Sequence, residues 1–130
     1  MNQTPLLPPP GSHFISLNRG IEMTSLFRAE KENVLATAFQ NEDILPVCET
    51  FNRSDIDTLL AKQGCEALRV YLGMDESLRI KLLLVSVNGN AEDILPVQST
   101  IGPDSNDDDD IVEEGQRCPP ACPPPSPLNP

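Results

Sequence analysis

The fold is decided by the stretch Leu68-Arg-Val-Tyr-Leu-Gly-Met-Asp-Glu-Ser-Leu-Arg-Ile-Lys-Leu-Leu-Leu-Val-Ser-Val87. Apolar and polar side chains alternate over residues 68–72, which is the period of a half-buried strand. Residues 73–77 are typical of a turn. A second strand is predicted over residues 78–87, and both of its faces become apolar after Leu82. The stretch therefore predicts two paired strands, with the second in a central, buried position.

Two helices are predicted upstream of these strands. Ser16 can act as the N-cap of a helix over residues 17–38, whose imperfect apolar period allows a break. A second helix is predicted from Ser54, which forms a capping-box-like pair with Asp57. Gly64 stands where a left-handed residue would end that helix.

A tight turn is predicted at residues 88–90, Asn-Gly-Asn, which favours a further hairpin. The expected fold is α+β, with two helices packed on a small, mostly antiparallel sheet. The expected organisation has a flexible leader (1–13), an α+β domain (14–101), an acidic linker (102–117) and a disordered Cys/Pro-rich tail (118–130).

One hexapeptide occurs twice: Glu-Asp-Ile-Leu-Pro-Val occupies residues 42–47 and 92–97. Proline holds the preceding leucine extended and removes a ladder donor, so each copy is expected to be an edge strand or a strand entrance. The functional alternative is that the two copies are equivalent docking edges, through which the chain could self-associate. The structural interpretation, which we favour, is that two similar strands meet the same local requirement.

Composition limits the partners. The chain has 130 residues and a net charge of −11, without a Lys/Arg stripe, which argues against nucleic acid and anionic membranes. The first residues lack a basic region and an apolar stretch of signal-peptide length, so a cytoplasmic location is expected. In that compartment the four cysteines are expected to be free thiols.

The acidic run over residues 104–110 does not form a calcium loop. An EF-hand needs glycine at its sixth position and glutamate at its twelfth. Counted from Asp104, these positions hold Asp109 and Gly115. Only weak, non-specific divalent binding is compatible with this run.

Cys118 and Cys122 are the candidate metal or redox residues. Two thiolates are half of a tetrahedral zinc site, and the single histidine, His13, lies at the other end of the chain. An extended polyproline segment rises about 3.1 Å per residue, which would place the two cysteines beyond disulfide reach unless the prolines turn. We therefore expect no metal and no cofactor, and keep thiol or metal chemistry as an alternative.

Peptide recognition has the strongest support in the sequence. Residues 117–123 have the R-x-x-P-x-x-P spacing that SH3 grooves read, and polyproline segments lose little entropy on binding. A merely solubilising tail is the structural alternative. The candidate partner-binding residues are Arg117, Cys118, Pro119, Pro120, Cys122, Pro123, Pro124, Pro125 and Leu128.

Catalytic machinery is not visible. Nucleophilic catalysis would have to use His13, which lies in the predicted leader. A small enzyme or ligand-binding domain would need a deep pocket, for instance one lined by Arg69, Tyr71 or Glu49. The expected function is a non-enzymatic interaction module that presents its C-terminal peptide to a protein partner.

Two stretches carry a resemblance to known proteins: Gly64-Cys-Glu-Ala-Leu-Arg-Val-Tyr-Leu-Gly-Met-Asp-Glu76 and Gly115-Gln-Arg-Cys-Pro-Pro-Ala-Cys-Pro-Pro-Pro-Ser-Pro-Leu-Asn129. In both, the chain resembles a group of small uncharacterised proteins from Bacteroidetes-type bacteria. The resemblance implies a bacterial cytoplasmic setting, which disfavours an SH3 partner. It implies no activity, cofactor or catalytic residue.

Overall fold

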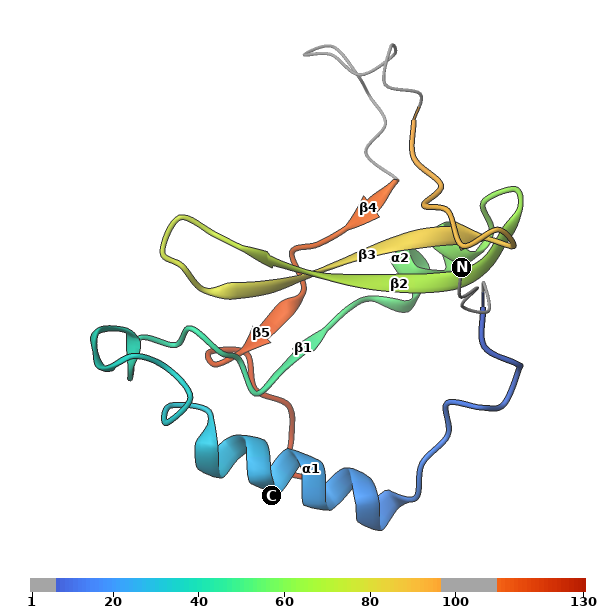
Figure 1. Cartoon of the computed structure of the whole chain (residues 1–130). Helices are drawn as coiled ribbons and strands as arrows, with labels where there is room; N and C mark the ends of the chain where they lie inside the picture. Colours follow the sequence, from blue (N-terminus) through green and yellow to red (C-terminus); the bar gives the residue numbers. More distant parts are fainter. Residues whose placement is uncertain (1–6, 97–109) are drawn as a thin grey trace, which may run out of the picture. The chain divides into compact units, whose positions relative to one another are not determined.

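The computed structural model describes residues 7–96 and 110–130, coloured in Figure 1. These residues form two compact units. The three-stranded unit contains residues 7–9, 51–73, 81–96 and 110–115; the two-stranded unit contains residues 10–50, 74–80 and 116–130. No helix in the described ranges is long and apolar enough to cross a membrane.

The three-stranded sheet has the order β2 (Cys65–Met74), β3 (Ile80–Asn88) and β4 (Ile111–Val112) (Figure 1). β4 runs antiparallel to β3, with Leu84 opposite Val112. The central, buried position predicted for the second strand is confirmed, since residues 84–87 of β3 are all buried. The hairpin tip, residues 74–80, is counted with the two-stranded unit.

Helix α2 (Arg53–Leu60) packs against β4 and completes the core of this unit. Its N-cap is Asn52, whose side chain accepts a hydrogen bond from the Ser54 amide at 2.9 Å, so the helix begins before the predicted Ser54. Leu59 is 0 % exposed, and the Ser86 hydroxyl donates to its carbonyl at 2.6 Å. This bond satisfies the one polar side chain of β3 that is fully buried.

The predicted turn after β3 is confirmed. The Asn88 side chain accepts hydrogen bonds from the amides of Asn90 and Glu92, and the chain reverses. In the described part of the returning segment, the pairing is an isolated bridge between Val87 and Asp93 rather than a full strand. Pro96 follows closely and has no amide hydrogen for a ladder.

In the two-stranded unit, β1 (Cys48–Thr50) pairs antiparallel with β5 (Gln116–Cys118). β1 directly follows the first copy of the repeat, so that copy is a strand entrance as predicted. The second copy ends at residue 97, outside the described ranges.

Helix α1 (Leu17–Glu30) belongs to the same unit. Ser16 is its N-cap and accepts from the Arg19 amide at 3.1 Å, as predicted. The helix ends eight residues before the predicted residue 38 because Asn33 and Val34, both weak helix formers, lie in a turn. A short 3-10 helix, η1 (Thr37–Phe39), follows.

The predicted disordered C-terminal tail is wrong. Residues 110–130 are described, and Cys118, the first residue of the predicted tail, is the buried last residue of β5. β4 and the first two residues of β5, including buried Arg117, lie in the predicted acidic linker. One sheet was predicted, whereas the described residues form two sheets, and each contains one strand from the segment after residue 109: β4 in the three-stranded sheet and β5 in the two-stranded sheet. The prolines were correctly expected not to build a core, but the residues just before them pair with β1. The acidic run, residues 104–109, lies outside the described ranges.

Candidate functional site

The C-terminal segment, defined here as residues 117–130, contains every residue that the sequence selects for partner binding. It leaves β5 at Cys118, and residues 120–128 are all exposed. Such an exposed run needs contacts that fix it in place. The contacts that fix it come from several parts of the two-stranded unit.

Arg117 anchors the start of the segment. Its side chain lies among the backbone groups of this unit, and the residue is 7 % exposed. The guanidinium donates to the carbonyls of Ile80 at 3.2 Å and Ile44 at 2.8 Å, and also to the carbonyl of Asp43. Its fork of five N–H donors suits this task, since several acceptors can be reached from one planar group. In the folded chain, Arg117 is therefore not exposed as the arginine of an R-x-x-P-x-x-P ligand would be.

Cys118 and Cys122 form a disulfide with a Cα–Cα distance of 4.5 Å, which corrects the expectation of free thiols for this pair. The chain does not stay extended between them: the Ala121 amide donates to the Arg117 carbonyl at 2.9 Å and closes a turn. The Cys118–Pro119 and Pro119–Pro120 peptide bonds are cis. The prediction failed because it assumed an extended polyproline path.

A metal at this pair is incompatible with the disulfide, because metal ligation uses the thiolate. Within residues 7–96 and 110–130, no group of three or more His, Cys, Asp or Glu side chains could hold a metal ion. His13 is exposed and lies in a turn before α1. The expected absence of a metal site remains a prediction.

The far end of the segment is fixed to α1. Arg28 donates to the carbonyl of Leu128 at 2.5 Å. A Cβ on Gly20 would lie 3.5 Å from the Leu128 side chain, so this leucine lies beside α1 at the position where the helix has no side chain. Ser126 and Asn129 exchange backbone hydrogen bonds and close a small loop around this leucine. The segment is thus held at both ends, and all of its prolines except Pro130 lie between the two anchors.

Cys48 is a functional candidate that sequence reasoning missed. The antiparallel register places it directly opposite Cys118, and its thiol is free and half-buried. The repeat places Cys48 beside a strand entrance, but its partner strand β5 lies where the sequence predicts the end of the acidic linker and the start of the tail. Three cysteines, Cys48, Cys118 and Cys122, therefore belong to one end of one strand pair.

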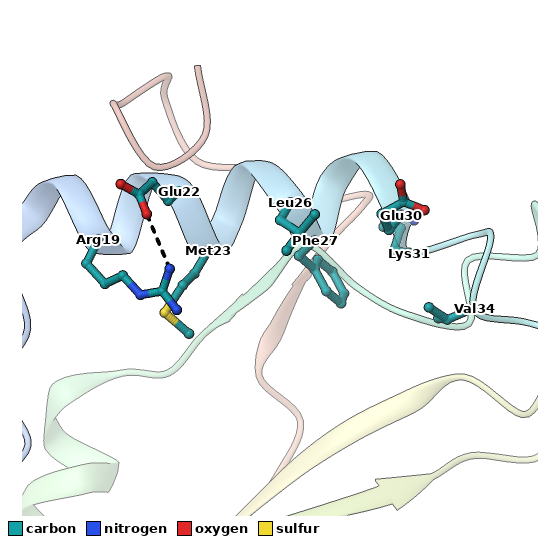
Figure 2. Close-up of a pocket in the computed structure, with 8 residues that line it drawn as sticks. All are labelled: Arg19, Glu22, Met23, Leu26, Phe27, Glu30, Lys31 and Val34. Atoms are coloured by element: carbon teal, nitrogen blue, oxygen red, sulfur yellow. Dashed lines mark hydrogen bonds and ion pairs between the residues drawn. The ribbon is translucent and has the colours of Figure 1, made fainter.

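The exposed face of α1 forms an apolar groove of about 610 Å³. Figure 2 shows Met23 and Phe27 on the same side of the helix, with the Arg19–Glu22 ion pair at one end. Large exposed apolar patches often mark interaction sites. The described residues identify no occupant for this one. The groove is lined by Arg19, Glu22, Met23, Leu26, Phe27, Glu30, Lys31 and Val34.

A polar cluster lies on β2 in the three-stranded unit. Arg69 donates to Asp93 at 2.6 Å, and the Tyr71 hydroxyl donates to the other oxygen of the same carboxylate. The hydrogen bond with Asp93 raises the pKa of both Arg69 and Tyr71 above their ordinary values. The shift makes both groups harder to deprotonate, which does not suit a general base.

A small enzyme was expected to need a pocket at Arg69, Tyr71 or Glu49, and three hollows among the described residues lie elsewhere. Besides the α1 groove, one hollow lies beside Ile44 and Arg79 and another beside Asp55 and Glu113. None of these three hollows is lined by Arg69, Tyr71 or Glu49. Comparison of the chain with protein-family models, curated proteins and solved structures finds no match.

Proposed function

We propose that the chain is a non-enzymatic protein-interaction module that presents its C-terminal segment to a partner protein as a preorganised loop. One observation carries this proposal: residues 120–128 are all exposed although the segment is anchored at both ends. Buried Arg117 and Cys118 fix the first end, and the Arg28–Leu128 hydrogen bond fixes the second.

Preorganisation is the physical advantage of this arrangement. A partner that binds a flexible tail has to order it, at a cost of about 0.5–1.5 kcal/mol for each immobilised rotamer-rich side chain. Here the disulfide, the turn at Ala121 and the prolines already restrict the loop. More of the contact free energy then appears as affinity.

The chemistry of the loop defines the class of partner. Prolines lack amide hydrogens, so a partner reads them through their apolar rings and through backbone carbonyls. Aromatic-lined grooves are the surfaces that recognise such segments. The contact residues on this proposal are the exposed Pro120, Cys122, Pro123–Pro125 and Leu128, with half-buried Pro119 at the base. Arg117 and Cys118 act as anchors, and the acidic run would steer a basic partner surface.

Site-specific crosslinking tests the proposal. A photoreactive phenylalanine analogue at Pro124 should capture a protein that the same group at Gln63, exposed in the three-stranded unit, does not capture. The captured protein is then purified and its affinity for the full chain is measured by calorimetry.

The combined change Pro123→Ala, Pro124→Ala and Pro125→Ala should weaken that affinity by about tenfold or more, a loss of about 1.4 kcal/mol. Alanine at exposed Arg53, Asp57 and Gln63 is the matched control and should leave the affinity unchanged. Equal weakening in both triple variants, or equal crosslinking at both positions, would show that the loop is not the recognition element.

Thiol–disulfide chemistry at Cys118 and Cys122 is a second candidate function, and the disulfide itself favours it. Intact mass spectrometry with and without a dithiol reductant tests it. Reduction under native conditions should add two hydrogens, whereas an unchanged mass would mean that the bond is purely structural.

A further inference from the structure

We propose that Cys48 is the internal nucleophile of a disulfide exchange that moves the bond from Cys118–Cys122 to Cys48–Cys118. The inference goes beyond partner binding and does not depend on it. The observation behind it is the strand register, in which Cys48 and Cys118 are direct cross-strand neighbours.

Cross-strand neighbours have their side chains on the same face of the ladder, with Cβ atoms about 4.5–5.5 Å apart and Cα atoms about 4.5–5.5 Å apart. Disulfides need Cα atoms within about 4.4–6.8 Å and slightly closer Cβ atoms. A small adjustment of short strands therefore suffices for a Cys48–Cys118 bond.

The exchange conserves atoms and electrons. The Cys48 thiol releases its proton to solvent, and the resulting thiolate attacks the Cys118 Sγ. A Cys48–Cys118 bond forms while the Cys118–Cys122 bond breaks. The electron pair of the broken bond leaves on the Cys122 Sγ, which takes a proton from water. One disulfide and one thiol exist before and after the step, so no oxidant or reductant is needed.

Burial directs the attack. Cys118 is 3 % exposed, so a thiol from solution has poor access to its sulfur, whereas Cys48 lies beside it on the neighbouring strand. Cys122 is exposed, and its departing thiolate is solvated by water. The internal thiol thus has access to the buried sulfur, and the exposed sulfur is the better leaving group.

The exchange would change the C-terminal segment. The new bond joins β1 to β5 covalently, and the short ring between Cys118 and Cys122 opens. The first anchor of the loop is relaxed and Cys122 becomes a free surface thiol. The module would then have two covalent forms, one with a closed loop and one with an open loop.

Disulfide mapping of the full-length oxidised chain tests the inference. After incubation without reductant at mildly alkaline pH and trapping with acid and then a maleimide, peptide mass spectrometry should find both bonds: Cys118–Cys122 with labelled Cys48, and Cys48–Cys118 with labelled Cys122. Cys48→Ser should abolish the labelling of Cys122. Cys65→Ser is the matched control, because Cys65 is a half-buried free thiol of the other unit, and it should change nothing.

A second variant tests the inference even if the equilibrium between the Cys118–Cys122 and Cys48–Cys118 bonds lies far to one side. Cys122→Ser treated with oxidised glutathione should close Cys48–Cys118 within one molecule, at a yield that does not depend on protein concentration. The inference is overturned if Cys122 is labelled equally in the wild type and in Cys48→Ser. It is also overturned if Cys122→Ser yields only glutathione mixed disulfides or intermolecular bonds.

Discussion

Replacing Arg117 by alanine should destabilise the two-stranded unit by about 2–4 kcal/mol. The Ile44 carbonyl keeps a second donor, the Ile80 amide at 2.7 Å. The substitution therefore removes the arginine donor from two further carbonyls, those of Asp43 and Ile80, both part-buried. A buried acceptor that loses its donor costs about 1–3 kcal/mol, and partial burial places each of these two near about 1–2 kcal/mol.

Urea unfolding followed by far-ultraviolet circular dichroism measures this loss, and hydrogen exchange over residues 43–50 shows where it occurs. Arg53→Ala is the matched control, because the Arg53 side chain is 91 % exposed and its ion pair with Asp57 lies on the surface. It should stay within about 0.5 kcal/mol of the wild type. Arg117→Lys should fall between the two, since lysine keeps the charge but not the fork. If Arg117→Ala behaves like the control, the C-terminal segment is not anchored as described.

Three further predictions concern the three-stranded unit. Leu59→Ala should lower the free energy of unfolding by about 2–5 kcal/mol, because this leucine is 0 % exposed, while exposed Leu60→Ala should cost far less; thermal or urea unfolding compares them. Ser86→Ala should cost about 0.5–1.5 kcal/mol, because the Leu59 carbonyl loses the hydroxyl donor but keeps the Lys62 amide at 3.3 Å; no change in the same unfolding assay would contradict this. Tyr71 is the single tyrosine, so an absorbance titration should show its pKa above the ordinary value of about 10, and Asp93→Asn should lower it. Because the folded-state pKa of Tyr71 is the raised one, the stabilisation by this hydrogen bond is complete below the unfolded-state pKa and is lost as the pH rises through the folded-state pKa. If Tyr71 titrates at the same pH in Asp93→Asn as in the wild type, the hydrogen bond with Asp93 is contradicted.

The hairpin could be predicted because its information is local. Alternation over residues 68–72, the turn residues and the doubly apolar stretch after Leu82 all indicate the same structure. The structure confirms β2, β3 and the central position of β3. The N-cap at Ser16 was equally accessible, because a capping side chain acts within three residues of itself.

The C-terminal segment could not be predicted because its contacts are remote in sequence. Arg117 reaches carbonyls more than seventy residues upstream at Asp43 and Ile44, and β5 pairs with Cys48–Thr50. Composition indicates that the prolines cannot form a core, and most of them are indeed exposed. Composition contains no information about the contacts of the two preceding residues, Arg117 and Cys118. Cys48 was missed for the same reason, since a cross-strand pair has no signature in spacing.

The repeated hexapeptide shows what local sequence leaves open. In the first copy, residues 42–47, the Ile44 carbonyl accepts from the first amide of β3 at 2.7 Å. In the second copy, residues 92–97, the Ile94 amide donates to a carbonyl of β3 at 2.9 Å. The same residue of the hexapeptide is thus fixed to β3 through opposite backbone groups. Identical sequence sets the extended entry before proline, and the partner strand decides which polar group is used.

In each copy of the hexapeptide, an arginine donates a hydrogen bond to the aspartate. Arg117 donates to the carbonyl of Asp43 in the first, and Arg69 donates to the carboxylate of Asp93 in the second. Docking edges for a second molecule would need free backbone donors and acceptors at these positions. The Ile44 carbonyl and the Ile94 amide, each next to one of these aspartates, already form hydrogen bonds with β3. The two copies are therefore better explained as two ways of holding an irregular segment against this strand. Self-association, if it occurs, should therefore leave hydrogen exchange at Ile94 unchanged, because its amide is already protected within one chain.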